Sequence, residues 1–335
     1  MSQSRSPSWS QLTESGNPTS GLPILEAVAI LRRGGLVAFP TETVYGLGAD
    51  ARNPAAVARL YTVKGRPPDH PVIVHLGDPA QLPDWAREIP QTARTLAERF
   101  WPGPLTLVLK RAQGVGDYLT GGQDTIGLRV PGHPVALELL RRFGGAIAAP
   151  SANKFGRVSP TTAQHVRADL DGEIDLVLDG GPCEVGIEST IVDLSRNGPV
   201  LLRPGRIGAE EIAAATGAPI ASHDARAPRA PGSLESHYAP RRPLRLVNAG
   251  RWEEAARGRA QARLGVLAFR ARPAGDASVL WIAASRDPAT YAHDLYVNLR
   301  ALDGSGCELI LVEDPPAGDE WTGVKDRLTR AAGSA

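Results

Sequence analysis

Apolar and polar residues alternate along the first two thirds of the chain in short segments that predict both helices and strands. Over 23–33, Val28 and Leu31 fall near one face of a helix. Asn53 followed by Pro54 is the pattern of an N-cap before a proline at the first helical position. The same kinds of pattern predict strands at 36–39, 72–76, 105–110, 126–130, 146–149, 175–178, 190–194 and 199–203, and helices at 53–63, 91–100, 134–142, 161–168 and 208–216.

Short strands interspersed with helices predict an α/β domain over 21–216, built on a twisted mixed sheet. Residues 217–243 differ, because their dense prolines are typical of a semi-rigid linker. Over 244–332, strands and helices alternate again, which predicts a small, three-layer, Rossmann-like module. Its predicted strands are 244–247, 264–268, 278–281 and 308–312, and its predicted helices are 251–262, 288–302 and 319–331. No G-x-G-x-x-G follows its first strand, so no dinucleotide site is expected there.

The chain has 335 residues, of which 42% are hydrophobic, and this is enough for two packed domains. Ser, Gln, Thr and Pro dominate residues 1–20, which predicts a disordered tail. No apolar run approaches the ~18–20 residues of a membrane-spanning helix, so we expect no membrane partner. Cys183 and Cys307 lack zinc-ligand spacing and cannot form a disulfide scaffold, so we expect two buried, reduced thiols in a cytoplasmic protein.

The balance of charge argues against one class of function. The 37 basic and 36 acidic residues give a net charge of +1, whereas a dedicated nucleic-acid binder usually carries a strong basic excess. A small or locally charged ligand is the better expectation. The sequence contains no P-loop, no G-x-S-x-G elbow and no kinase motif set, and no residue stands out as a protein nucleophile.

Polar segments follow several predicted strands, at the position where α/β sheets place their ligands. Residues 40–48 contain hydroxyl groups and a carboxylate after the strand at 36–39, although this segment alone favours an ordinary polar turn. Lys64 and Arg66 lie two residues apart on a loop that Gly and Pro constrain. This setting modestly favours an anion site over a solvated basic loop.

Two polar side chains interrupt apolar strands. A histidine in the position of His75 is more often a satisfied core residue than a catalyst. No second ligand lies at a spacing that would suit a metal. Arginine is rarely buried unless it is paired, and Arg129 lies in an apolar strand. A structural ion pair and a carboxylate-binding role are equally supported for it.

The segment 148–160 again follows a strand and combines small residues with two serines, Asn153 and two cations. A ligand-binding role is favoured over a flexible connector, because the following helix can present its N-terminus to the same ligand. Segments 186–190 and 203–206 are ordinary loops when taken alone. Together they add hydroxyl groups and arginines at further strand ends.

Taken in order, these segments resemble a known family. The matching blocks are PTETVYGLG, KGRPPDHPVIVHL, WPGPLTLVL, GLRVPGHP, APSANKFGRVSPT, GIESTIVD and LRPGRI, over roughly 36–207. They are similar to the Sua5/YrdC/YciO family, and the linker segment SHYAP with the module after it resembles the longer, two-domain Sua5 form. The resemblance implies a YrdC-like open α/β twist with a large, positively charged central cavity, followed by a Sua5 C-terminal domain.

The resemblance also implies an activity, the synthesis of L-threonylcarbamoyladenylate. L-threonine and bicarbonate or CO₂ would form N-carboxythreonine, whose carboxylate attacks the α-phosphorus of ATP and releases pyrophosphate. Mg²⁺ is the expected cofactor and would accompany ATP with few protein ligands. The product would pass to a tRNA threonylcarbamoyl transferase complex, which modifies tRNAs that read codons beginning with A.

Site residues follow from the matching motif positions. Lys64, Arg66 and Arg203 are implied to stabilise negative charge at the reacting phosphate, and Arg129 to clamp the threonine carboxylate. Tyr238 suggests that the linker folds over the cavity as a lid, and the alternative is a simple tether with Tyr238 packed between domains. The implied threonine site is Thr43, His75, Arg129, Ala149 and Ser189, and the implied ATP site is Arg66, His70, Thr125, Ser151, Asn153, Ser159, Arg203 and Tyr238.

Two other functions compete with this one. Relatives in the family have been described as binding RNA, and weak RNA binding is a further expectation, although the near-neutral charge argues against it as the main role. Carbamoyl-adenylate chemistry, as in hydrogenase-maturation carbamoyltransferases, would call for acylphosphatase and zinc-finger-like modules, which this chain lacks.

Overall fold

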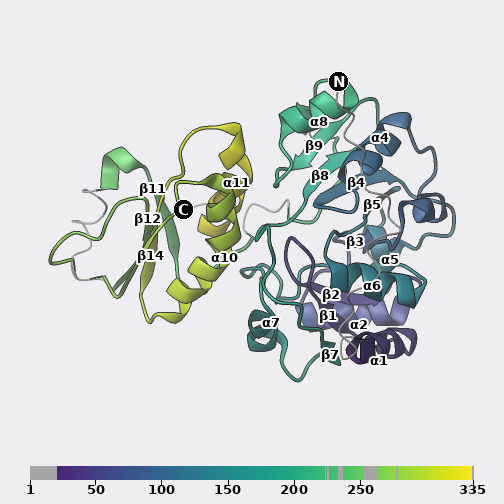
Figure 1. Ribbon diagram of the computed structural model, residues 1–335, viewed down its shortest axis with the longest axis horizontal. Helices are drawn as coiled ribbons and strands as arrows, with labels where there is room; N and C mark the ends of the chain where they lie inside the picture. Colours follow the sequence, from purple (N-terminus) through teal and green to yellow (C-terminus); the bar gives the residue numbers. More distant parts are fainter. Residues whose placement is uncertain are drawn as a thin grey trace, which may run out of the picture.

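The computed structural model describes residues 21–222, 224, 226–232, 237–252, 255, 263–276 and 278–333. The predicted tail over 1–20 and most of the predicted helix over 251–262 lie outside these residues. The chain forms two lobes joined by the linker, and Figure 1 shows the smaller, C-terminal lobe on the left and the larger lobe on the right.

The larger lobe is built on one ten-stranded mixed sheet, whose strands follow the order β10-β9-β8-β4-β5-β3-β6-β2-β1-β7. Parallel pairs such as β3 with β5 alternate with antiparallel pairs such as β4 with β5. Its strands are β1 (Val37–Phe39), β2 (Gly46–Asp50), β3 (Ile73–His75), β4 (Leu105–Lys110), β5 (Thr125–Arg129), β6 (Ile147–Ala148), β7 (Leu176–Val177), β8 (Thr190–Asp193), β9 (Val200–Arg203) and β10 (Ala221–Ser222).

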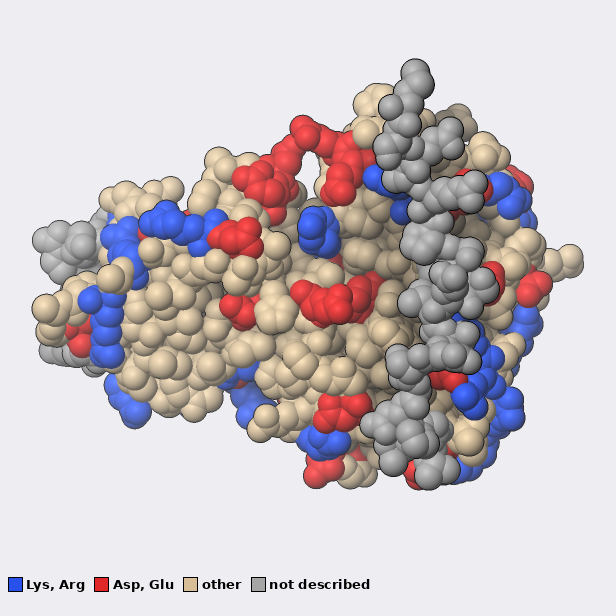
Figure 2. Space-filling view, in the orientation of Figure 1, with Lys and Arg blue, Asp and Glu red and all other residues tan. Residues whose placement is uncertain are grey.

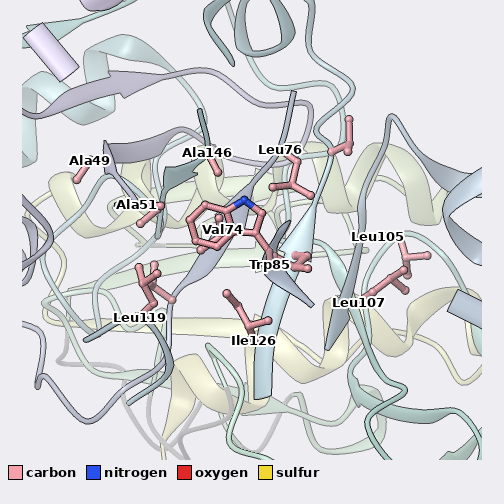
Figure 3. Packing of buried hydrophobic residues seen from close by; sticks show 14 of the residues in the cluster. Ala49, Ala51, Val74, Leu76, Trp85, Leu105, Leu107, Leu119, Ile126 and Ala146 are labelled. Carbon is pink, nitrogen blue, oxygen red and sulfur yellow. The ribbon is translucent and has the colours of Figure 1, made fainter. Parts of the chain in front are cut away.

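Helices cover one face of this sheet and half of the other. On the first face, α2, α4 and α8 pack with α3 against the strands, and the ring of Trp85 lies near Val74, Ala146 and Ile126 (Figure 3). On the second face, α1 and α6 cover β1 and β6. The helices of this lobe are α1 (Gly21–Arg32), α2 (Pro54–Lys64), α3 (Leu82–Trp85), α4 (Gln91–Phe100), α5 (Asp117–Thr120), α6 (Pro134–Phe143), α7 (Ala163–Leu170) and α8 (Ala209–Thr216).

The remaining half of the second face is covered by the linker. Because side chains alternate along a strand, Val74 enters the core whereas Ile73 and His75 point to this second face. Ala230 of the linker packs there in a small cluster with Ile73 and Val108. A sheet face without a helix is therefore roofed by an irregular segment, and this arrangement creates a polar cavity.

The smaller lobe contains a four-stranded parallel sheet in the order β11-β14-β12-β13. Its two long helices lie on the face toward the larger lobe, as Figure 1 shows, and the buried Leu295 and Leu328 belong to the core beneath them. On the opposite face of this sheet, Trp252 and Ala255 pack against Val247, Val266 and Leu311. The elements of the lobe are β11 (Leu244–Val247), β12 (Leu264–Ala268), β13 (Leu280–Ala283), α10 (Pro288–Gly304), β14 (Leu309–Glu313) and α11 (Thr322–Ala332).

Most predicted elements are present within a few residues, but four short ones are corrections. Residues 46–48, predicted as the end of a polar turn, belong to β2, and α5 forms where no helix was predicted. Helix α3 was not predicted, and β10 lies inside the predicted linker. Both cysteines are buried and unpaired, as expected. None of the helices within the described residues is long and apolar enough to cross a membrane.

The cap of α2 provides a test of the local pattern. The Asn53 side chain accepts hydrogen bonds from the backbone N–H groups of Ala55 and Ala56, each at 3.1 Å. We expect Asn53→Ala to lower the free energy of unfolding by about 1 kcal/mol, because it leaves these donors without their partner. Urea denaturation measures this change. Asn53→Asp keeps an acceptor and should remain near wild type, and an equal loss in both variants would contradict the capping role.

Candidate functional site

The polar cavity lies on the open half of the sheet and is roofed by Pro231, Gly232, His237 and Tyr238 of the linker. The structure brings all five residues of the predicted threonine site to this cavity: Thr43, His75, Arg129, Ala149 and Ser189. Four residues of the predicted ATP site also line it: Arg66, Ser151, Arg203 and Tyr238.

The other predicted residues occupy different places. Lys64 and Asn153 lie directly behind the cavity wall, where Lys64 Nζ donates to the carbonyl oxygens of Ser151, at 2.5 Å, and of Asn153. His70 lies beside the cavity, and its ring packs edge to face on Phe155 with a centroid distance of 5.3 Å.

Two further residues of the predicted ATP site are held by other contacts. Ser159 is buried and its hydroxyl donates to Glu188 at 2.5 Å. Thr125 lines a separate narrow pocket with Arg229 and Pro231 of the linker. Ile73 and Pro231 line both this pocket and the cavity, so Thr125 lies in a neighbouring compartment.

Three buried basic side chains, Arg66 and Arg203 at the cavity and Lys64 behind its wall, have no carboxylate bonded to them among the described residues. Arg66 Nη2 donates to the Pro71 carbonyl at 2.6 Å, and Arg203 Nε donates to the Ser189 carbonyl at 3.0 Å. Burial lowers the pKa of Lys64 well below its usual range and also lowers the pKa of both arginines. Because buried charge is unfavourable unless it is paired, this arrangement suits an anionic ligand.

Arg129 has a carboxylate partner but keeps a donor. Its Nη2 atom lies 2.8 Å from Oε1 of Glu42, and its Nε donates to the Gly103 carbonyl at 3.1 Å. The close pair of atoms is not aligned as a hydrogen bond, so Nη2 and Oε1 have no hydrogen-bond partner within the described residues. The arginine is thus both a structural ion pair and a group with a donor available to a carboxylate ligand, which unites the two alternatives left by the sequence.

Two histidines at the cavity are neutral at physiological pH. Burial, reinforced by nearby arginines, lowers the pKa of His75 and of His237 to about 3 in each case. Nδ1 of each ring has no hydrogen-bond partner in the part of the chain that the structure describes. His75 is therefore not the fully satisfied core histidine that its strand position favours, and both rings add polarity to the cavity without adding charge.

Tyr238 is held in a strained conformation at the cavity roof. Its φ is +61°, a backbone angle that residues other than glycine rarely adopt, and the residue is 1% exposed. Its ring lies 5.3 Å from the guanidinium of Arg327 and 5.9 Å from the ring of Tyr296. Both neighbours belong to the smaller lobe, so Tyr238 lies where the larger lobe, the linker and the smaller lobe meet.

Glu188 and His237 line the cavity but were not singled out by the sequence. A signal for Glu188 exists, because it stands between the turn at Gly186 and the buried hydroxyl of Ser189. Burial alone would raise the pKa of Glu188, but the guanidiniums of Arg327 and Arg203 and the hydrogen bond from the Ser159 hydroxyl lower it to about 2. This carboxylate is ionised and committed to partners from both lobes.

No group of three or more His, Cys, Asp or Glu side chains in the described ranges could hold a metal ion. The two carboxylates nearest the cavity, Glu42 and Glu188, are each in an ion pair with an arginine. A divalent ion at this cavity would therefore take most of its ligands from a bound phosphate and from water.

Comparison with known proteins identifies the family of the chain. Residues 29–205 match the family model described as telomere recombination, Sua5/YciO/YrdC, and residues 207–333 match the threonylcarbamoyl-AMP synthase C-terminal domain. The threonylcarbamoyl-AMP synthase of Bacillus subtilis is 42% identical over 333 residues, which cover 94% of each chain. Its counterpart from Pyrococcus abyssi is 40% identical over 92% of this chain and 93% of its own.

A solved structure agrees with both lobes. The crystal structure of P. abyssi Sua5 complexed with L-threonine has a TM-score of 0.86 and 39% identity, and it covers 92% of this chain and 94% of its own. The chain therefore belongs to the Sua5/YrdC/YciO family, in its two-domain Sua5 form.

The depressed pKa of Glu188 predicts an acid-sensitive contribution to stability. Its ordinary value of 4.5 falls to about 2 in the folded protein, so the ionised carboxylate stabilises the fold fully above pH 4.5. This contribution is lost as the pH falls through about 2. We expect Glu188→Gln to lower the free energy of unfolding at pH 7 by about 3 kcal/mol, since Arg327 keeps a buried charge without its main partner.

Chemical denaturation at a series of pH values tests this expectation. The stability gap between wild type and Glu188→Gln should narrow as the pH falls from 4.5 toward 2. The control is Glu173→Gln, because Glu173 forms an exposed ion pair with Lys154 and should show only a small gap. A gap for Glu188→Gln that does not change with pH would contradict the assignment.

Proposed function

We propose that the cavity joins L-threonine, bicarbonate or CO₂ and ATP into threonylcarbamoyl-AMP, with release of pyrophosphate. The protein is a threonylcarbamoyl-AMP synthase, as are its relatives of about 40% identity over most of the chain. The observation that carries the proposed mechanism is that two buried arginines, Arg66 and Arg203, line a cavity whose hydroxyl groups and histidines are neutral, with the buried Lys64 behind its wall. Such a cavity is matched to a triphosphate.

The cavity has two halves in this proposal. The threonine half is Thr43, His75, Arg129, Ala149 and Ser189, in which Nη2 of Arg129 would receive the α-carboxylate. The relative from P. abyssi was solved with L-threonine bound, which supports a threonine site in this fold. The nucleotide half is Arg66, Ser151, Arg203 and Tyr238, with Lys64, Asn153 and Ser159 behind the wall and His70 and Thr125 at its margin.

The substrate itself is the nucleophile. The carboxylate of N-carboxythreonine attacks the α-phosphorus of ATP, so the protein needs no nucleophilic Ser or Cys. Holding the reactants in line can supply about 7–11 kcal/mol of the barrier. Lys64, Arg66 and Arg203 would stabilise the negative charge that develops on the phosphate in a site from which water is excluded.

Mg²⁺ would enter with ATP and neutralise part of the charge on the phosphates. The protein contributes few ligands in this proposal, because Glu42 and Glu188 are already paired with arginines. Residues over 217–243 would act as a lid. In the closed arrangement described here, Arg203 Nη1 donates to the Pro231 carbonyl at 2.9 Å, a bond that the linker would release when ATP enters.

Finer features of the fold belong to the same proposal. The cavity corresponds to the central basic cavity of an open α/β twist, and the smaller lobe to a Rossmann-like Sua5 domain that starts near residue 244. We place the reaction in the cytoplasm, where the labile product would reach a tRNA threonylcarbamoyl transferase complex. Among the described residues on the face shown in Figure 2, Lys and Arg are interspersed with Asp and Glu, and this distribution does not favour RNA binding as the main activity.

Pyrophosphate release tests the proposed reaction. Released pyrophosphate should depend on ATP, Mg²⁺, bicarbonate and L-threonine together, and mass spectrometry should find threonylcarbamoyl-AMP. Arg129→Lys should raise the KM for threonine about tenfold and leave the KM for ATP nearly unchanged, because lysine lacks the planar fork. Arg59→Lys, in an exposed pair on α2, is the control. Release without threonine dependence would overturn the assignment.

The lid is tested at Tyr238. We expect Tyr238→Ala to lower kcat/KM for ATP about 100-fold, because the roof over the reacting groups loses its largest side chain. Tyr238→Phe keeps the ring between Arg327 and Tyr296 and should retain most activity. Full activity of Tyr238→Ala in the pyrophosphate assay would favour the simple tether.

A further inference from the structure

The carboxylate of Glu188 joins the two lobes at the cavity wall. Its Oε1 accepts a hydrogen bond from the Ser159 hydroxyl, whereas Oε2 accepts from the Tyr296 hydroxyl at 2.9 Å and from Arg327 Nε at 2.7 Å. Tyr296 lies on α10 and Arg327 on α11, so both enter from the smaller lobe. Arg327 also pairs with its neighbour Asp326.

Arg327 in addition holds the backbone of two loops at the cavity. Its Nη1 donates to the carbonyl oxygen of Pro204 at 2.9 Å, and its Nη2 donates to the carbonyl oxygen of Glu188 at 3.1 Å. The next residue after Glu188 is Ser189, and the residue before Pro204 is Arg203, both of which line the cavity. The guanidinium is 0% exposed, and each of its three nitrogen atoms donates to a group of the protein.

The helices of the smaller lobe approach these loops at backbone distance. A Cβ atom on Gly186, whose φ is +80°, would collide with the backbone of His293 on α10. A Cβ atom on Gly323 of α11 would lie 3.1 Å from the carbonyl oxygen of Gly205. Contacts of this kind leave no flexible side chain to absorb a shift, so the position of α10 and α11 is transmitted directly to the loops.

Arg327 and Tyr296 also contact the linker. Tyr238 lies between the guanidinium of Arg327, at 5.3 Å, and the ring of Tyr296, at 5.9 Å and an interplanar angle of 30°. Because Tyr238 lines the cavity, the smaller lobe contacts both the wall and the roof of the site through one pair of residues.

We propose that Arg327 and Tyr296 are positioning residues for the nucleotide half of the cavity. By binding Glu188 the two residues orient Ser159, and Arg327 also holds the loop that follows Arg203 through the Pro204 carbonyl. Both side chains pack on Tyr238 and so hold the closed linker. The smaller lobe is then a wall of the active site. This inference rests on the proposed function for the reaction that is positioned, whereas the contacts themselves stand independently of it.

Steady-state kinetics of the full chain test the proposal. Arg327→Met should lower kcat/KM for ATP about 100-fold through misplacement of the cavity wall. Arg327→Lys should recover part of this loss, because lysine keeps the charge for Glu188 but cannot bond both carbonyl groups. Tyr296→Phe, which removes one hydroxyl and keeps the packing, should lower it about tenfold. The matched control is Lys325→Met on α11, since Lys325 makes none of these contacts and should behave as wild type.

Hydrogen exchange separates positioning from loss of folding. Assays are run well below the unfolding temperature of each variant, and Arg327→Met should exchange faster over 186–190 and 203–206 than Lys325→Met. A folded Arg327→Met or Tyr296→Phe with wild-type kinetics for ATP would overturn the proposal, as would unchanged protection of these loops. If the wild type shows no threonine-dependent pyrophosphate release, the proposed function fails, and the exchange measurement still decides whether the two residues fix the wall.

Discussion

Lys64, Arg66 and Arg203 are buried around one cavity, and backbone carbonyl oxygens bond to all three. Carbonyl dipoles solvate a cation without cancelling its charge, so the cavity keeps a positive field that water does not screen. The nearby carboxylates do not remove this field, because Glu42 and Glu188 are engaged by Arg129 and Arg327. The two buried histidines are neutral at physiological pH and add no charge to the cavity. The elements that enclose the cavity maintain this positive field by keeping water out.

A field of this kind requires that the cavity be closed on every side. The sheet provides the floor, and α1 and α6 cover only the neighbouring half of its second face. The roof comes from the linker, and the smaller lobe supports the roof through α10 and α11. Segments more than 100 residues apart in sequence therefore surround one ligand site, as the bond between Glu188 and Arg327 with its separation of 139 residues illustrates.

Local pattern was sufficient for most of the fold. The strand at 105–110 and the helix at 91–100 have the predicted bounds, because their periodicity is regular and their ends carry clear signals. Strand β2 could not be predicted in this way, since Gly46-Leu47-Gly48 has low strand propensity. It forms because β1 and β6 pair with it on its two sides, so the neighbouring strands decide its conformation.

The site divides along the same line. The five residues of the predicted threonine site all line the cavity, and each belongs to one of the matching sequence blocks. Thr125 shows the limit of this approach, since the position of the linker over β5 is a tertiary feature that no local motif encodes. The role of Arg327 could not be predicted either. An arginine on the buried side of α11 can be interpreted only when its partner, 139 residues earlier in the chain, is known.

Helix α8 packs in the core of the larger lobe, where Ile212 is fully buried, and β10 extends its sheet beside β9. Both elements nevertheless fall within residues 207–333, which match the model of the C-terminal domain. The boundary of the family model, at residue 207, thus differs from the boundary between the two lobes of the structure. A chain divided at residue 207 would remove a helix and an edge strand from the larger lobe, whereas a division after β10 would keep both of these elements in that lobe.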